Sequence, residues 1–166
     1  MANEVYIAPG STTKFASAGD VVFTPTSIAS GAMRISAEAT LGTTFTTARA
    51  DEYHWSAQTK WLDTLEVGET LDIYIAEADS DGDYDGTLTA GDATLSESTD
   101  VLKNLNYVGS IIATTATEQI ERTSGVVRIK SNKCVVVFHN NATPALSASA
   151  GDHEFALTPI PYQSQS

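Results

Sequence analysis

The residues in this chain best suited to chemistry are the oxygen-bearing side chains of one stretch, DGDYDGTLTAGD at positions 81–92. Ca²⁺ takes about six to eight oxygen ligands, and a twelve-residue calcium loop supplies them from positions 1, 3, 5, 7 and 12, with glycine at position 6. Counted from the first aspartate, the glycine is Gly86 and the ligand positions are Asp81, Asp83, Asp85, Thr87 and Asp92. The spacing therefore predicts a structural calcium site.

The surroundings of this stretch allow a second interpretation. A twelve-residue calcium loop normally lies between two helices, whereas LDIYIAEA at 71–78 alternates like a strand. Asp92 also replaces the bidentate glutamate usual at position 12, which should weaken binding or change its geometry. An acidic, solvated turn is therefore the alternative. A bound metal would stiffen a loop between strands rather than run a reaction.

Signatures of catalysis are missing from the sequence. The three histidines, His54, His139 and His153, are scattered, with no HExxH motif and no close pair for zinc. There is no GxSxG elbow, and GSTTK at 10–14 lacks the spacing of a phosphate loop. At the end of an apolar strand, His139 is interpreted as a polar cap rather than a base. We therefore predict that the protein is not an enzyme.

Two tryptophans and one cysteine each have a structural and a functional interpretation. Trp55 and Trp61 could form a platform for a sugar ring, but they share one face of an alternating segment, which favours the core. Cys134 lies in the apolar run KCVVVF and is interpreted as a buried small hydrophobe rather than a reactive thiol. A single cysteine cannot form a disulfide within the chain.

Length and charge limit the classes of partner. The chain has 166 residues, which suits one domain, with 21 acidic and 9 basic residues and a formal net charge of −12. Such a surface would repel nucleic acid and anionic membranes, so we expect neither as a direct partner. No apolar run approaches the ~20 residues of a membrane helix, and the first ten residues lack a secretion signal. We expect synthesis in the cytoplasm.

Alternating polar and apolar residues indicate strands along most of the chain. In YHWSAQTKW at 53–61, one face carries Tyr53, Trp55, Ala57, Thr59 and Trp61. In LDIYIAEA, one face carries Leu71, Ile73 and Ile75. The other predicted strands are 5–8, 21–24, 32–37, 107–113, 126–130, 134–139 and 153–160. The connection SNK at 131–133 fits a hairpin between two of them.

These segments predict an all-β fold, an antiparallel β-sandwich with long loops and at most one or two short helices. A jelly roll is one form of this fold, and the sequence leaves its strand order open. The helical candidates are 92–105 and, against its β-branched content, 113–122. No linker divides residues 1–166, which we expect to form a single domain. The ends at 1–4 and 162–166 are predicted to be flexible or to grip a partner.

Roughly residues 50–160 resemble small structural proteins of tailed bacteriophage virions. The resemblance lies in the order of segments: LDIYIAEADSD, an acidic loop, LKNLNYVGSIIATT, and then VVVFHNNATPALSASAGDHEFAL. The stretch ALSASAGDH followed by an alternating strand is its most recognisable piece. These motifs contain no catalytic signature. The loop at 79–92 departs from the pattern because it is unusually rich in aspartate.

The resemblance implies a capsid decoration (cement) protein on the outer surface of the virion. Such a protein binds across major capsid protein subunits and stabilises the head, often as a homotrimer at local threefold positions. One alternative is a structural protein of the tail or neck. Another is a calcium-stabilised module that binds a glycan or a cell surface, with Trp55 or Trp61 as its platform.

Overall fold

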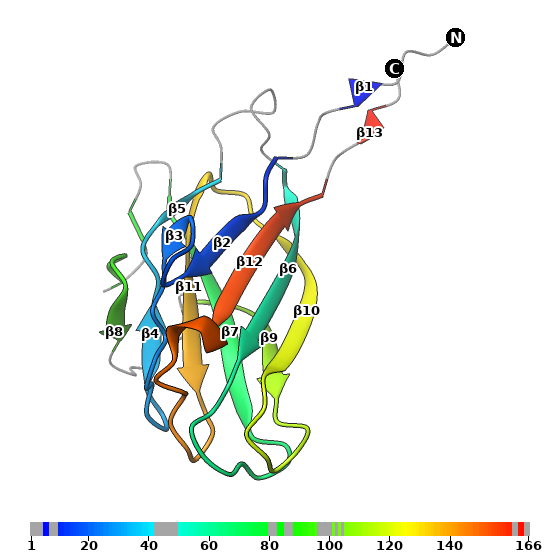
Figure 1. Cartoon of the computed structure of the whole chain (residues 1–166). Helices are drawn as coiled ribbons and strands as arrows, with labels where there is room; N and C mark the ends of the chain where they lie inside the picture. The colour runs from blue at the N-terminus through cyan, green and yellow to red at the C-terminus, as the bar shows by residue number, and fades with distance from the viewer. Residues whose placement is uncertain are drawn as a thin grey trace.

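The chain folds into two facing β-sheets in this computed structural model (Figure 1). The structure describes residues 5–6, 10–41, 50–79, 83–84, 88–95, 101, 103, 105–160 and 163–164. Its elements are β1 (Val5–Tyr6), β2 (Thr13–Ala16), β3 (Val21–Val22), β4 (Met33–Ile35), β5 (Ala39–Thr40), β6 (Glu52–Thr59), β7 (Thr70–Glu77), β8 (Ala93–Leu95), β9 (Asn106–Ile112), β10 (Glu121–Arg128), β11 (Lys133–Asn140), the 3₁₀ helix η1 (Ala150–Asp152), β12 (Glu154–Pro159) and β13 (Gln163–Ser164).

The strand order is that of a jelly roll. One sheet runs β10-β6-β12-β2-β3, and the other runs β8-β4-β11-β7-β9, with β5 also paired to β11. Apart from the short parallel pair β2–β3, every pairing between the described strands of these two sheets is antiparallel. The chain crosses repeatedly between the sheets, as a double-sheet jelly roll requires. The predicted all-β sandwich is therefore confirmed, and its strand order is now defined.

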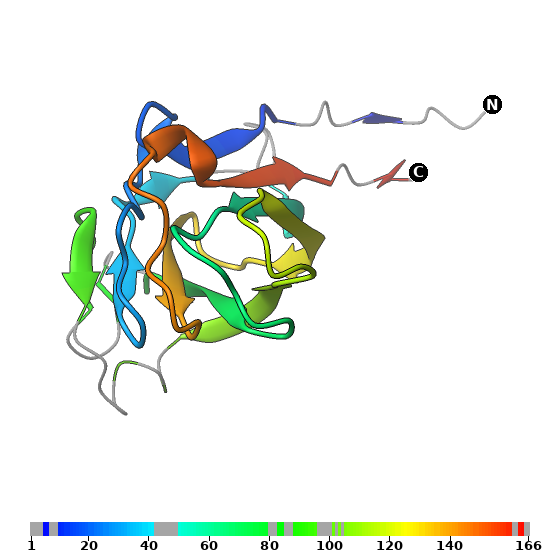
Figure 2. The same ribbon diagram turned by 60° about the horizontal axis from the view of Figure 1, so that its bottom comes forward.

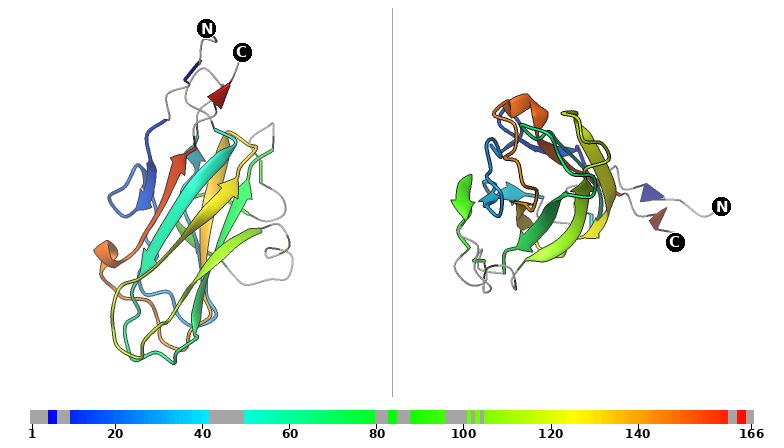
Figure 3. Two further views of the ribbon diagram at one scale, coloured as in Figure 1. Left: turned by 90° about the vertical axis from the view of Figure 1, so that its right-hand side faces the viewer. Right: turned by 90° about the horizontal axis from the view of Figure 1, so that it is seen from below.

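The two sheets enclose one core and meet along one side (Figure 2, Figure 3). Alternation places Tyr53, Trp55, Ala57 and Thr59 of β6 inside, as predicted, with Trp61 beyond the strand also buried. Leu71, Ile73 and Ile75 of β7 face them from the other sheet. Strands β9 and β10, from different sheets, lie against each other where the sandwich closes. Within the described part of the chain, no helix has the length and apolar character needed to span a bilayer.

A second apolar cluster covers the outer face of the six-stranded sheet. Met33, Ile35, Ala76, Val135 and Val137 pack there with Leu88, Val101 and Leu105 from the long β7–β9 connection. Strand β11 is consequently buried on both faces, and Cys134 to Asn140 are all buried. This explains the continuous apolar run CVVVF, which would be out of place on a strand with one wet face.

Strand β11 ends at Asn140, whose fully buried side chain organises this end of the sandwich, the lower end in Figure 1, towards which the β11 arrow points. Its Oδ1 accepts hydrogen bonds from Trp61 Nε1 at 3.0 Å and from the Ala142 amide at 3.2 Å. Its Nδ2 donates to the carbonyls of Ile28 at 3.1 Å and Pro144 at 2.9 Å. All four hydrogen-bonding positions of the amide are therefore used, and one side chain joins three loops.

The predicted hairpin through residues 131–133 is wrong. Strand β10 pairs with β6, and β11 pairs with β4, β5 and β7, so the two strands belong to opposite sheets. Ile129 is fully buried, and its amide donates to the Asp51 carbonyl. The Glu77 carboxylate accepts hydrogen bonds from the amides of Lys130 and Ser131. These contacts hold a short connection that crosses between sheets instead of reversing within one.

The helix predicted over 92–105 is also wrong for its first part. Ala93–Leu95 form β8, paired with β4, although Val101 and Lys103 further on are helical. The region 113–122 contains no helix and ends in β10, as its β-branched content favoured. Strands β2 and β5 were not predicted. The expected strand at 126–130 in fact begins at Glu121.

The indole of Trp55 occupies space that two glycines leave open. Trp55 stacks on Phe155, with ring centroids 6.0 Å apart and planes 17° apart. A Cβ added at Gly125 of β10 would lie 2.8 Å from Trp55 Nε1, and one added at Gly109 of β9 would lie 2.8 Å from its six-membered ring. The edge where the sheets meet is thus packed by one large ring against bare backbone.

We expect Gly125→Ala to lower the free energy of unfolding by about 1–3 kcal/mol, because the new methyl group overlaps Trp55 in a filled core. Urea denaturation measures the change. Gly151→Ala is the matched control, since a Cβ there meets nothing within 4 Å. The double variant Gly125→Ala with Trp55→Phe should lose less stability than the sum of the losses in the two single variants. Unchanged stability in Gly125→Ala would contradict the packing described.

Candidate functional site

The predicted calcium ligands lie partly outside the described residues. This is the case for Asp81, Asp85 and Thr87. Asp83 is exposed, and its amide donates to Asp79 Oδ1 at 2.9 Å while the Asp79 amide donates to the Asp83 carbonyl at 2.8 Å. These two bonds tie Asp83 to Asp79. The calcium site stays a prediction.

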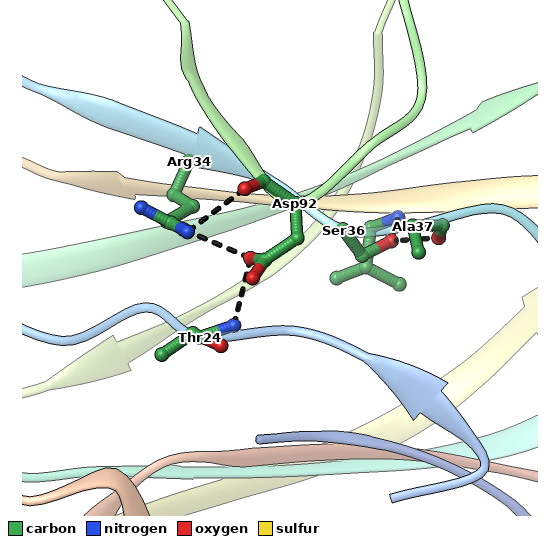
Figure 4. A network of polar contacts seen from close by, with 6 residues as sticks. Thr24, Arg34, Ser36, Ala37 and Asp92 are labelled. Atoms are coloured by element: carbon green, nitrogen blue, oxygen red, sulfur yellow. Dashed lines mark hydrogen bonds and ion pairs between the residues drawn. The ribbon is translucent and has the colours of Figure 1, made fainter. Parts of the chain in front are cut away.

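Asp92, the predicted ligand at position 12, takes part in a protein network (Figure 4). Its Oδ1 accepts from Arg34 Nε at 2.9 Å and from the Thr24 amide at 2.8 Å, and Arg34 Nη2 donates to its carbonyl at 2.8 Å. Partial burial works to raise the pKa of Asp92, but the bonds from Arg34 and Thr24 outweigh it and hold the pKa below its ordinary value.

The Asp92 network joins three separate segments of the chain. Arg34 lies in β4, Thr24 follows β3, and Asp92 precedes β8 with a positive φ of 49°. Beside it, the Gly91 amide donates to the Ser36 carbonyl. A metal bound through Asp92 would share this carboxylate with a guanidinium. Among the described residues, no group of three or more histidine, cysteine, aspartate or glutamate side chains is placed to hold a metal ion.

The structure places both tryptophans in the core, as predicted. Trp55 is 3% exposed and Trp61 is 0% exposed, so neither ring offers a face to a sugar. Cys134 is likewise buried, as predicted. Burial raises the pKa of the Cys134 thiol far above its ordinary value, with Glu77 and Glu38 adding to the shift. The thiol is therefore not activated as a nucleophile.

His153 and Thr59 form a buried pair that resembles a base and a nucleophile. His153 Nε2 lies 2.9 Å from the Ser147 carbonyl, so this nitrogen carries the hydrogen, and Nδ1 accepts from Thr59 Oγ1 at 2.8 Å. Thr59 is 0% exposed and His153 is 1% exposed. Burial lowers the pKa of His153, against opposing effects of Ser147 and Asp152. Both side chains are buried, and the pair joins the last residue of β6 to the residue that precedes β12.

The remaining histidines differ in their surroundings. His54 is exposed on the outer face of β6. His139 is buried at the far end of the apolar run, as a residue ending a core strand. Within the described part of the chain, neither ring nitrogen of His139 has a hydrogen-bond partner. The three histidines do not come together.

An open hollow of about 400 Å³ lies on the outer face of the five-stranded sheet, over β6, β10 and β12. We call it the outer-sheet hollow. It is lined by His54, Ser56, Ala57, Gln58, Arg122, Thr123, Ser124 and Glu154. Sequence analysis did not identify it, because its residues come from three strands that are distant in the sequence.

Ladder register explains why the sheet surface is hollowed at this place. Ser124 of β10, Ser56 of β6 and Ala156 of β12 are direct neighbours and form a row of small side chains across the strands. A row of longer side chains lies on each side of this row, two residues away along the strands. One consists of Arg122, Gln58 and Glu154, and the other of Val126, His54 and Thr158. Short side chains between two rows of longer ones create a trough that crosses the strands.

A second hollow of about 320 Å³ adjoins the first. It is lined by Lys14, Ala16, Ser17, Ala18, Gly19, Ala150, Gly151, His153 and Glu154. Glu154 belongs to both hollows, and its carboxylate lies 3.7 Å from Lys14 Nζ. Both partners of this ion pair are substantially exposed, so solvent weakens it.

The neutral, buried His153 predicts a loss of stability in mild acid. Its folded pKa is lowered, so the unfolded chain binds the proton more readily. The part of the free energy of unfolding that depends on neutral His153 is complete above the unfolded pKa of about 6.5. It is lost as the pH falls from there towards the folded pKa. Urea midpoints between about pH 7.5 and pH 5 should therefore fall, ahead of carboxylate titration.

Two histidine variants test whether His153 causes this loss of stability. His153→Gln should be less stable at neutral pH, but its stability should change less across the same pH range; His54→Gln, at an exposed position, is the control for the substitution itself. An undiminished slope in His153→Gln would contradict the assignment.

If DGDYDGTLTAGD binds calcium, the melting temperature in millimolar calcium should exceed that in EGTA by several degrees, because a ligand of the folded state stabilises it. Asp81→Ala or Asp85→Ala should remove the shift. Asp63→Ala, an exposed acidic residue in another loop, is the control and should retain it. An equal melting temperature in both solutions would make the stretch an acidic turn.

Comparisons with known proteins place the chain in no family. A scan against models of known protein families finds no match, and a search of curated proteins finds none either. The resemblance to phage structural proteins therefore remains an expectation. The function has to be inferred from the residues, the fold and the described surface.

Proposed function

We propose that this protein is a structural component of a tailed-phage virion, a decoration protein that binds across major capsid protein subunits on the outer head surface. It acts by mass action, because it binds the assembled shell and not the free subunits, and so stabilises the assembly. Its partners are the major capsid protein and further copies of itself in a homotrimer. The reaction chemistry of an enzyme has no part in this role.

The observation that carries the proposal is the two-stranded ribbon formed by β1 and β13. Val5 pairs with Ser164 and Tyr6 with Gln163, and the ribbon stands apart from the sandwich at the end where both termini leave (Figure 1, Figure 3). Its strands pair with no other strand of the described chain. An isolated two-stranded ribbon is marginal in water, whereas its open edges can accept a strand from a neighbour.

Three further features support this role. Jelly rolls are widespread in viral capsid proteins, although a fold alone does not establish a function. A net charge of −12 keeps the protein soluble and would attract basic patches on a shell. The resemblance of residues 50–160 to small phage structural proteins points the same way. A closed trimer would also protect the ribbon edges that one copy leaves open.

A position on the tail or neck is the alternative within the virion, since the same ribbon could join subunits there. The glycan-binding alternative has lost the platform on which it rested, because Trp55 and Trp61 are both buried. A glycan site on the described surface would have to use a different aromatic pair, Tyr74 and Tyr107, whose ring centroids lie 5.6 Å apart and of which Tyr107 is 59% exposed.

The test compares phage particles made with and without the gene. The temperature at which packaged DNA becomes accessible to a dye should be lower by several degrees in particles that lack the protein. Adding back purified protein should restore it. A variant lacking residues 1–6 and 163–166 should fold but fail to restore it, while Lys130→Gln, an exposed change on the body, should restore it fully.

Labelling with an antibody against the protein then separates the alternatives. Label on the head agrees with decoration, label on the tail or neck favours the alternative, and absence from particles excludes both. If the label is on the head but particles that lack the protein release their DNA at the same temperature as particles that carry it, the cement role is contradicted.

A further inference from the structure

The outer-sheet hollow contains an unusual number of polar side chains that are not engaged. Within the described part of the chain, His54, Ser56, Arg122, Thr123 and Ser124 make no side-chain hydrogen bond. Gln58 has only a long contact of 3.5 Å to the Gly151 carbonyl. Several converging donors around a depression of about 400 Å³ are what a small binding site provides.

Arg122 distinguishes this hollow from the rest of an acidic surface. The chain has 21 acidic residues, and the described arginines Arg34 and Arg128 each pair with an aspartate. Among the described residues, Arg122 makes no ion pair with an acidic side chain. Its planar guanidinium presents a fork of donors that fits a carboxylate in two parallel hydrogen bonds.

The trough has the dimensions of an extended peptide. Neighbouring strands lie about 4.8 Å apart, so the floor from β10 across β6 to β12 is roughly 10 Å long, and Lys14 of β2 follows beside Ala156. An extended chain advances about 3.3 Å per residue, so roughly three residues would lie on the floor and a fourth would reach Lys14. Ser56 and Ser124 on the floor and Gln58 on the wall can bond peptide groups, while Arg122 and Lys14 offer two positive charges near the single carboxylate of Glu154.

We propose that the outer-sheet hollow binds an extended, acidic peptide segment of a partner protein, lying across β10, β6 and β12 with a carboxylate on Arg122. The bound segment also competes with Glu154 for Lys14 where the two hollows join. The inference concerns this surface alone and does not require that the partner be a capsid protein.

The probe is acetylated, amidated tetraglutamate, titrated into ¹⁵N-labelled full-length protein and followed by amide chemical shifts. The shifts should centre on residues 56, 58, 122 and 124 and should weaken as salt is added. Arg122→Gln should weaken binding about tenfold or more, because a hydrogen-bonded charge pair is lost. Lys14→Gln should weaken it less, since Lys14 already has a partner. Tetraglutamine should not bind.

Two variants keep the test specific. Lys130→Gln removes the same charge from an exposed position two residues beyond the end of β10 and should leave binding unchanged. Ser56→Gln keeps every charge but fills the floor, and should reduce binding as strongly as Arg122→Gln. The amide spectra of both variants report whether the fold is intact.

The proposal would be overturned by an absence of localised shifts at millimolar tetraglutamate, by equal weakening in Arg122→Gln and Lys130→Gln, or by unaltered binding in Ser56→Gln. Preference for an oligomer of galacturonic acid over the peptide would also overturn it, since the hollow would then be a carbohydrate site.

Discussion

The fully satisfied amide of Asn140 is the interaction on which the lower half of the sandwich depends. Four hydrogen bonds from one buried side chain fix Trp61 and the loops that carry Ile28, Ala142 and Pro144. A buried amide is costly unless all its positions are bonded, so these four contacts must form together. With the loops fixed, Trp61 can close the end of the core without leaving its indole nitrogen unbonded.

Periodicity in the sequence was enough to predict the long strands but not their partners. The inward faces of β6 and β7 follow from local alternation, which needs no knowledge of the rest of the chain. Strands β2 and β5 are too short for alternation to be visible. The segment 131–133 has the length of a hairpin, and only the burial of Ile129 between the sheets reveals a crossing. Tertiary contacts decide whether the chain reverses within one sheet or crosses to the other, and they leave little signal in the local sequence.

The surface was harder to predict than the core for a related reason. The calcium spacing is a local pattern, and Asp92 nevertheless bonds Arg34, which is 58 positions away. The outer-sheet hollow depends on the register of three strands, because Ser56, Ser124 and Ala156 become neighbours only after pairing. The one available signal was small residues at the outward positions of alternating strands, and it has meaning only once the strand order is known.

The β1–β13 ribbon lies at one end of the sandwich, so the two ends, or poles, of the molecule differ. The opposite pole consists of loops 60–69, 113–120 and 141–149, tied by bonds such as the Gly68 amide to the Ala113 carbonyl and the Thr143 amide to Glu69. A copy anchored by its ribbon would turn these braced loops away from the anchor. Peptides grafted into them would be displayed outward, whereas fusions to either terminus would be trapped against the surface to which the protein is attached.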